Sequence, residues 1–405
     1  MTVTAAQPAA TLSSSSAPSA RTIITALLAT TLLIKACGFA YDFLGYYIGD
    51  AHGTTAAGAA LTVFGIGWCV GQLASGAVTD RLGARTACSI GLLLAAAACA
   101  GLAAAGTLRA LLLLAFCLGC TMDVSRPALS AEINERVTSE GARTRAQGWM
   151  YWVSNVGVSL SGGVGGYLAH EHGYQALFVA NAVACVAAAV FARRVLSGRP
   201  AARDGQEVRS YRKLLADVSL RWMVTASIAT MVCAYGLVSV LPLVMNADGL
   251  PPSAYGTAMI ANTVAVLVIS PPLTRVLVGR DDRVRFAVAP VLAAGSLVLG
   301  AAMGLAALQH TTLGYSVAAV ATVPGEVCYC VAIGAYLATA APPGAIGRYQ
   351  AALSGAGAIA SLTPLGIAIA LNTGGRPLVA GLLAASAAVA ALACLPLSRS
   401  LRISA

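Results

Sequence analysis

Five ionisable residues lie inside long apolar stretches of the chain: Lys35, Asp42, Asp123, Arg126 and Glu326. A charged side chain near the centre of a bilayer costs about 2.5 to 3.5 kcal/mol on insertion scales, so each such residue is a candidate for function. A carboxylate in that setting can bind a proton or a charged ligand. These residues therefore point to reversible protonation or ligand binding within a membrane.

The spacing of the charged residues allows them to interact. On a helix, Lys35 and Asp42 project from one face about two turns apart, and Asp123 and Arg126 also share a face. Two interpretations stay open. The acids bind transported protons with an affinity set by burial and by Lys35 or Arg126, or the pairs are static and only neutralise charge.

Glu326 has no basic residue in its own apolar stretch and follows Pro324 and Gly325, where we expect the helix to kink. At 1.5 Å per residue, Glu326 falls near the middle of its stretch. An acid at that depth without a basic neighbour is more easily explained as a protonatable group. We therefore predict proton coupling by Glu326, Asp123 and Asp42, with Glu326 favoured.

The composition indicates a membrane protein, and the length of its apolar stretches predicts an all-α one. The 405 residues are 58% hydrophobic and only 10% charged, with a mean hydropathy of +0.79, a balance that fits no soluble class. A spanning helix needs about 20 apolar residues. This length criterion predicts twelve transmembrane helices, at 22–48, 55–78, 87–105, 110–133, 147–168, 174–191, 220–244, 255–278, 284–308, 313–340, 349–371 and 377–397.

The basic residues support this count and orient the chain. The sequence has 25 Lys and Arg residues and a net charge of +10. With twelve spans, all of them fall on one side of the membrane except Lys35 and Arg126 inside helices and Arg109 and Arg376 on the other side. The positive-inside rule then places both termini in the cytoplasm. Aromatic residues are not interleaved with basic ones, so no nucleic-acid partner is predicted.

One long polar connection divides the chain. We predict a disordered N-terminal tail at 1–20, a first six-helix bundle at 21–191, a cytoplasmic linker at 192–219, a second six-helix bundle at 220–397 and a C-terminal tail at 398–405.

The loop from Gly76 to Arg85 carries a recognisable pattern. The ten residues read Gly-x-x-x-Asp-Arg-x-Gly-x-Arg, in which the internal defined positions are Asp80, Arg81 and Gly83. This pattern resembles the signature between helices two and three of the major facilitator superfamily. The resemblance covers the chain apart from its tails and implies two bundles around a central cavity lined by helices one, four, seven and ten. It also implies that these five residues form a conformational latch.

The fifth span carries a second pattern. Gly157, Ser161 and Gly165 form a stripe of small residues suited to close helix packing. The stretch is similar to the antiporter signature Gly-x-x-x-Gly-Pro-x-x-Gly-Gly, with Ser161 and Gly162 in place of the Gly-Pro pair. Ordinary helix packing stays open as the alternative. Acids in spans one, four and ten also resemble those of the multidrug proton antiporters.

The resemblance places several polar and aromatic side chains in the cavity. An apolar cavity with a few polar anchors suits an amphipathic ligand. The predicted lining residues are Lys35, Arg126, Tyr46, Tyr235 and Tyr329 in spans one, four, seven and ten, and Tyr151, Trp152 and Asn155 on the side of span five opposite its small residues.

We therefore predict a monomeric, multi-pass transporter of the cell (plasma or inner) membrane that exports a small amphipathic molecule, a drug or natural product. It exchanges this molecule for protons, as in multidrug resistance by efflux. The proton gradient is the energy source, and no cofactor, catalytic residue or metal site is predicted. A proton-coupled importer of a nutrient is the nearest alternative, and a non-transporting membrane sensor is an alternative of another class.

The latch yields a first prediction. We expect Asp80 to bind the amino end of the eleventh span, a contact that contributes about 0.3 to 1 kcal/mol. An Asp80→Asn protein should therefore turn over severalfold more slowly while its ligand affinity changes less. Transport kinetics in reconstituted vesicles, beside ligand binding by the purified protein, check this. Undiminished transport by the variant would contradict the latch.

Overall fold

The computed structural model describes residues 20–121, 124–136, 140–197, 216–278, 285–341 and 346–403, and every element within them is an α-helix. The predicted tail at 1–20 and most of the linker at 192–219 lie outside these residues. The elements are α1 (Ala20–Ala36), α2 (Phe39–His52), α3 (Thr54–Ala104), α4 (Leu108–Thr121), α5 (Ser125–Arg136), α6 (Glu140–Val195), α8 (Val218–Ala234), α9 (Gly236–Ala247), α10 (Pro252–Leu277), α11 (Val288–Ala307), α12 (Thr312–Ala340), α13 (Ile346–Ala360) and α14 (Pro364–Ile403).

The outward faces of these helices are apolar. Leu73 is 86% exposed and Leu313 is 75% exposed, which suits contact with lipid. Within the described residues, nine helical segments are long and apolar enough to cross a membrane. The two longest contain Gly173 and Gly375, whose positive φ angles of 81° and 65° interrupt the helix. The chain is thus a multi-pass membrane protein, and the count of twelve remains a prediction.

Several spans predicted to be continuous are broken. The first is interrupted between α1 and α2 at Gly38, where the amide of Ala40 donates to the side chain of Asn181 at 3.0 Å. The seventh is interrupted at Tyr235, between α8 and α9. By contrast, α12 continues through Pro324, where we expected a kink. A break is tolerated in an apolar setting when another side chain satisfies the freed backbone group.

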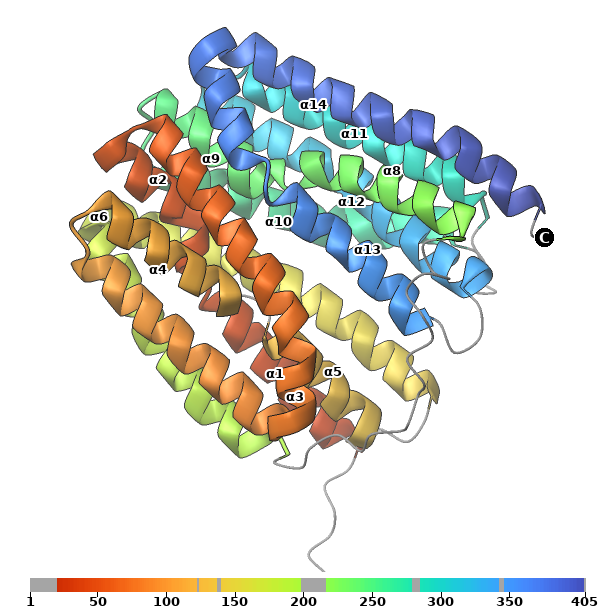
Figure 1. Ribbon diagram of the computed structural model, residues 1–405, viewed down its shortest axis with the longest axis horizontal. Coiled ribbons are helices and arrows are strands. Elements are labelled where there is room, and N and C mark those ends of the chain that lie inside the picture. Colours follow the sequence, from red (N-terminus) through yellow and green to blue (C-terminus); the bar gives the residue numbers. More distant parts are fainter. Residues whose placement is uncertain are drawn as a thin grey trace, which may run out of the picture.

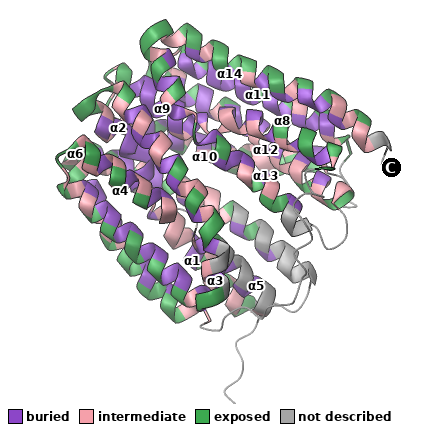
Figure 2. Cartoon of the chain, viewed as in Figure 1, coloured by how far each residue is buried: buried purple, intermediate pink, exposed green. Residues whose placement is uncertain are grey.

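The helices form two halves, α1 to α6 and α8 to α14, that meet at one end only (Figure 1). The largest hydrophobic core contains residues of both halves, including Phe43 and Phe64 from the first and Tyr255 and Leu383 from the second. Two smaller cores are separate, one within each half. We call the end with the shared core the joined end and the other the split end. Buried residues gather around α2, α9 and α10 at the joined end (Figure 2).

Close backbone contacts hold the halves together at the joined end. A Cβ atom at Gly65 on α3 would lie 2.2 Å from the carbonyl oxygen of Ser361, between α13 and α14. Across the same contact, the amide of Leu365 donates to Thr62 Oγ1 at 2.8 Å. The side chain of Asn372 donates to Thr55 Oγ1 at 2.8 Å. Glycine is therefore required where the two backbones touch.

This contact predicts the effect of one added methyl group. A Gly65→Ala change forces α3 away from Ser361, and overpacking of this kind costs about 1 to 3 kcal/mol. We expect a lower thermal unfolding temperature for the purified protein. Gly366→Ala is the matched control, because a Cβ atom there meets nothing within 4 Å. Equal unfolding temperatures for the two variants would contradict the contact.

Candidate functional site

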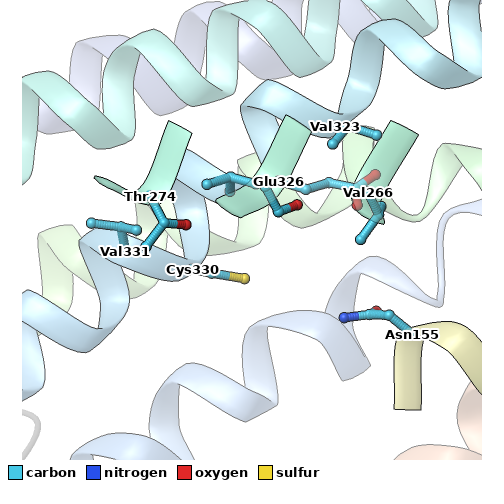
Figure 3. Close-up of a pocket in the computed structure, with 9 residues that line it drawn as sticks. Asn155, Val266, Thr274, Val323, Glu326, Cys330 and Val331 are labelled. Carbon is cyan, nitrogen blue, oxygen red and sulfur yellow. The ribbon is translucent and has the colours of Figure 1, made fainter. Parts of the chain in front are cut away.

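A cavity of about 90 Å³ lies between helices of the two halves, beside the Glu326 carboxylate (Figure 3). Asn155 on α6 comes from the first half, and the other lining residues come from α10 and α12 of the second. Ligand pockets typically measure about 300 to 1,000 Å³, so this one has room for a single polar group of a larger ligand. Its lining residues are Asn155, Val266, Ser270, Thr274, Val323, Glu326, Val327, Cys330 and Val331.

Glu326 is held by neutral hydrogen bonds. Thr322 Oγ1 lies 2.9 Å from Glu326 Oε1 and 2.8 Å from the carbonyl oxygen of Ala319. The side-chain amide of Asn262 donates to Thr322 Oγ1 at 3.2 Å. One hydroxyl proton on Thr322 therefore has two possible acceptors. No cation among the described residues forms an ion pair with Glu326.

Asp42 occupies a different environment. Its carboxylate lies on α2 within the shared core and is only 3% exposed. Ser161 Oγ on α6 donates to Asp42 Oδ2 at 2.7 Å. Ser161 is one of the two residues, with Gly162, that depart from the antiporter signature. Asp42 and Glu326 thus belong to separate halves and to separate surroundings, and the structure does not bring them into contact.

The stripe of small residues on α6 and the glycine beside it pack against different neighbours. A Cβ atom at Gly157 would lie 2.6 Å from Lys35 Cβ on α1, and one at Gly165 would lie 2.7 Å from the Phe43 ring on α2. A Cβ atom at Gly166 would lie 3.0 Å from the Cα atom of Gly256 on α10. The stripe therefore packs within its own half, and the adjoining Gly166 packs against the other half.

The remaining predicted cavity residues are scattered. Trp152 is 39% exposed and packs edge-on against Trp149, and Arg126 on α5 is exposed. Tyr46 is fully buried in the shared core, and Tyr329 lies in the core of the second half. Tyr235 contacts the Trp68 ring with centroids 5.4 Å apart. Asp123 and the side chain of Tyr151 lie outside the described residues.

The latch loop is described in part. Gly83 interrupts α3 with a φ angle of 77°, a conformation that favours glycine. Arg85 Nε donates to the carbonyl oxygen of Leu196 at 2.8 Å, at the carboxyl end of α6, where a cation is favourable. Arg81 is exposed. The side chain of Asp80, the surroundings of Gly76 and residues 342–345 lie outside the described residues, so the proposed contact of Asp80 stays a prediction.

Two buried polar residues with contacts of note were not predicted from the sequence. Thr322 precedes Glu326 by four residues, a helical spacing that the sequence does show. Glu132 is fully buried. Its carboxylate accepts hydrogen bonds from the amide of Ser197 at 2.6 Å and from Arg136 Nη1 at 3.2 Å. Glu132 and Arg136 are also four residues apart, so the sequence shows that contact. The hydrogen bond from Ser197 to Glu132 joins residues far apart in the chain.

Asp217 caps the amino end of α8 at the split end. Its Oδ1 atom accepts the amide protons of Ser219 at 2.8 Å and Leu220 at 3.2 Å, and its Oδ2 atom accepts the Tyr349 hydroxyl. Burial acts to raise the pKa of Asp217, but these hydrogen bonds, with one from the Ser219 side chain, outweigh burial and lower the pKa below its ordinary value.

This shift predicts a pH dependence. Because the folded pKa lies below the unfolded one, the ionised carboxylate stabilises the fold above about pH 4, and this contribution is lost as the pH falls through the folded pKa. Asp217→Ala should lower the free energy of unfolding by about 1 kcal/mol near neutral pH, as for other lost caps. Thermal unfolding over a pH series checks this.

Asp217→Asn is the control, because asparagine still caps a helix without a charge. The deficit of Asp217→Asn relative to the wild type should disappear in acid. A deficit that does not change with pH would contradict the role of the charge.

The comparisons with known proteins agree on the architecture. A family model described as Major Facilitator Superfamily matches residues 12–364. A crystal structure of a POT family transporter in complex with a thioalcohol-conjugated peptide has a TM-score of 0.76 at 15% identity, over 94% of this chain and 96% of that chain. A mutant of the peptide transporter POT gives 0.74 at 13% identity, over 96% and 100%.

A mutant of the nucleoside transporter NupG gives a TM-score of 0.72 at 12% identity, over 93% of this chain and 99% of that chain. At these identities the likeness concerns the fold, so the transported molecule has to be argued from the site.

Proposed function

We propose that this chain, which belongs to the major facilitator superfamily, is a proton-coupled transporter that exports a small amphipathic molecule. The observation that carries the proposal is the Glu326 carboxylate in a cavity to which both halves contribute, with Asn155 from the first half. A movement of one half against the other changes this cavity. A group bound beside Glu326 is therefore coupled to alternating access.

The positive charges orient the proposed cycle. Arg81, Arg85, Arg136 and Arg194 belong to the split end, whereas Arg376 belongs to the joined end. By the positive-inside rule the split end faces the cytoplasm. We therefore propose twelve spans with both termini cytoplasmic, and a conformation in which the cavity beside Glu326 faces inward.

The hydrogen bonds around Glu326 suit both of its charge states. The ionised carboxylate accepts the proton of the Thr322 hydroxyl. The protonated carboxyl donates to Thr322 Oγ1 instead, and the Thr322 hydroxyl then donates to the carbonyl oxygen of Ala319. Asn262 keeps its bond to Thr322 in both states. The site therefore exchanges a proton without leaving a buried polar group unsatisfied.

Charge makes the exchange obligatory. Closing the split end removes Glu326 from water, and burying a carboxylate without a counterion costs several kcal/mol. Either a proton or the positive group of a ligand removes that cost. The protein therefore switches between its inward-facing and outward-facing conformations only with a proton or a ligand bound. This requirement couples the proton flux to a ligand flux in the opposite direction.

The lining supports an amphipathic ligand. Val266, Val323 and Val327 offer apolar contact, while Asn155 and Glu326 offer polar anchors. A proton-coupled importer is the second candidate, because similar solved structures include a POT family transporter in complex with 5-aminolevulinic acid. That molecule carries an amine, which a carboxylate such as that of Glu326 would also bind.

Proton release tests the coupling. We expect ethidium, an aromatic cation, to release protons from the purified wild-type protein in weakly buffered solution, because the cation displaces the proton from Glu326. Glu326→Gln should abolish the release. Glu171→Gln is the matched control, since Glu171 is exposed. Ethidium binding without proton release from the wild type would contradict coupling at Glu326.

Flux assays in reconstituted vesicles decide the direction of transport. An exporter moves ethidium in one direction while protons flow down their gradient in the other. An importer accumulates dialanine or uridine together with protons, and that result would replace export with import. Absence of flux for every probe in a folded preparation would favour a non-transporting protein.

A further inference from the structure

Two hydroxyl groups in the cavity beside Glu326 have no hydrogen-bond partner in the part of the chain that the structure describes. They belong to Ser270 and Thr274, which lie one turn apart on α10. Elsewhere on the same helix, Thr263 Oγ1 donates to the carbonyl oxygen of Met259 at 2.8 Å. Serine and threonine hydroxyls within helices often bond to a carbonyl oxygen four residues earlier in this way. The two cavity hydroxyls instead remain available to a ligand.

These hydroxyls share the cavity with a carboxylate. Ser270 and Thr274 line the same space of about 90 Å³ as Glu326. Figure 3 shows Thr274 and Glu326 on neighbouring helices, with Asn155 facing them from the first half. A carboxylate has about four lone-pair sites, and the Thr322 hydroxyl occupies one of them. Glu326 therefore keeps room for a further donor.

The acceptors and the charge define the group that fits this space. Glu326 contributes a negative charge, and Glu326, Ser270 and Thr274 all contribute oxygen acceptors. A protonated primary amine has one positive charge and three N–H donors. We propose that the cavity binds the primary ammonium group of the transported molecule, which donates to these three side chains. The inference rests on the proposed function and names the class of its ligand, an amphipathic primary amine.

The hydroxyls are satisfied with and without the ligand. When the ammonium group donates to Ser270 Oγ and Thr274 Oγ1, each hydroxyl turns its own proton to the carbonyl oxygen four residues earlier. Those oxygens belong to Val266 and to Ser270 itself. Without the ligand, both hydroxyls bond to water, since Thr274 is exposed and Ser270 is half-buried. Release of the amine therefore leaves no hydroxyl without a partner.

Proton binding and amine binding use different neighbours of Glu326. The proton on Glu326 is accommodated by Thr322 on α12, whereas the amine also requires Ser270 and Thr274 on α10. Both occupants depend on the same carboxylate, so they exclude each other. Removing the α10 hydroxyls should therefore change which ligands bind without removing the competition with the proton.

The size of the cavity predicts selectivity between amines. The space admits one polar group, and Val266, Val323 and Val327 offer apolar contact to the attached carbon chain. A quaternary ammonium group has the same charge, but methyl groups replace its N–H donors. A site built to hydrogen-bond an N–H group discriminates against an analogue that lacks it. We therefore expect a preference of at least about tenfold for the primary amine.

Matched ligands test this preference. The probes are 2-phenylethylamine and its N,N,N-trimethyl derivative, which have the same ring, the same chain and, near neutral pH, the same charge. Isothermal titration calorimetry measures their affinities for the purified full chain. The wild type should bind 2-phenylethylamine at least about tenfold more tightly. Combining Ser270→Ala with Thr274→Val should remove this preference by weakening 2-phenylethylamine alone.

Three controls separate the hydroxyls from structural effects. Thr263→Val removes a hydroxyl of the same helix that bonds to Met259 and does not line the cavity, so it should change neither affinity. Glu326→Gln should weaken both compounds, because both are cations. Ser270→Ala and Thr274→Val should each reduce the preference when introduced singly, so the test does not depend on the double variant folding.

The outcomes are distinct. Equal affinities of the two compounds for the wild type, or no binding of either, overturn the primary-amine inference, and proton release by ethidium remains the separate test of the proposed function. A preference that persists in the double variant overturns the role of Ser270 and Thr274. Affinities that do not change with Glu326→Gln overturn both the inference and the role of Glu326 in the proposed function.

Discussion

The two halves of the molecule share a hydrophobic core at one end and have separate cores at the other. An apolar side chain gains little free energy when it exchanges lipid for protein contacts. Close packing of small residues therefore has to hold the helices together. Gly65 and Gly166 provide such contacts between the halves. Every other feature depends on this asymmetry. It leaves Glu326 beside a cavity and encloses Asp42, so the two carboxylates differ in access.

The carboxylates inside the molecule have two kinds of partner. Glu132 pairs with Arg136, and Asp248 pairs with Arg376, in both cases near the ends of helices. Asp42 and Glu326 instead bind the neutral hydroxyls of Ser161 and Thr322. A hydroxyl can donate to a carboxylate or accept from a carboxylic acid, so these two sites accommodate either state.

The sequence predicts what depends on composition and local spacing. Apolar length indicates a multi-pass membrane protein, the loop signature indicates the family, and the glycine of that loop indicates the turn at Gly83. The break after α1 was missed because its amide is satisfied by Asn181, which lies 141 residues away. The burial of Tyr46 was missed because it depends on which end of the molecule is closed. No local pattern contains either kind of information.

The departure of this chain from the antiporter signature has a physical explanation. The signature has glycine where this chain has Ser161, and the Ser161 hydroxyl is the hydrogen-bond donor to Asp42. Glycine at that position would leave a carboxylate that is 3% exposed without this bond, which costs more than leaving a neutral group unsatisfied. Serine is still small enough for close packing of α6. The substitution therefore belongs with the acid on α2, and the two positions are best understood as one site.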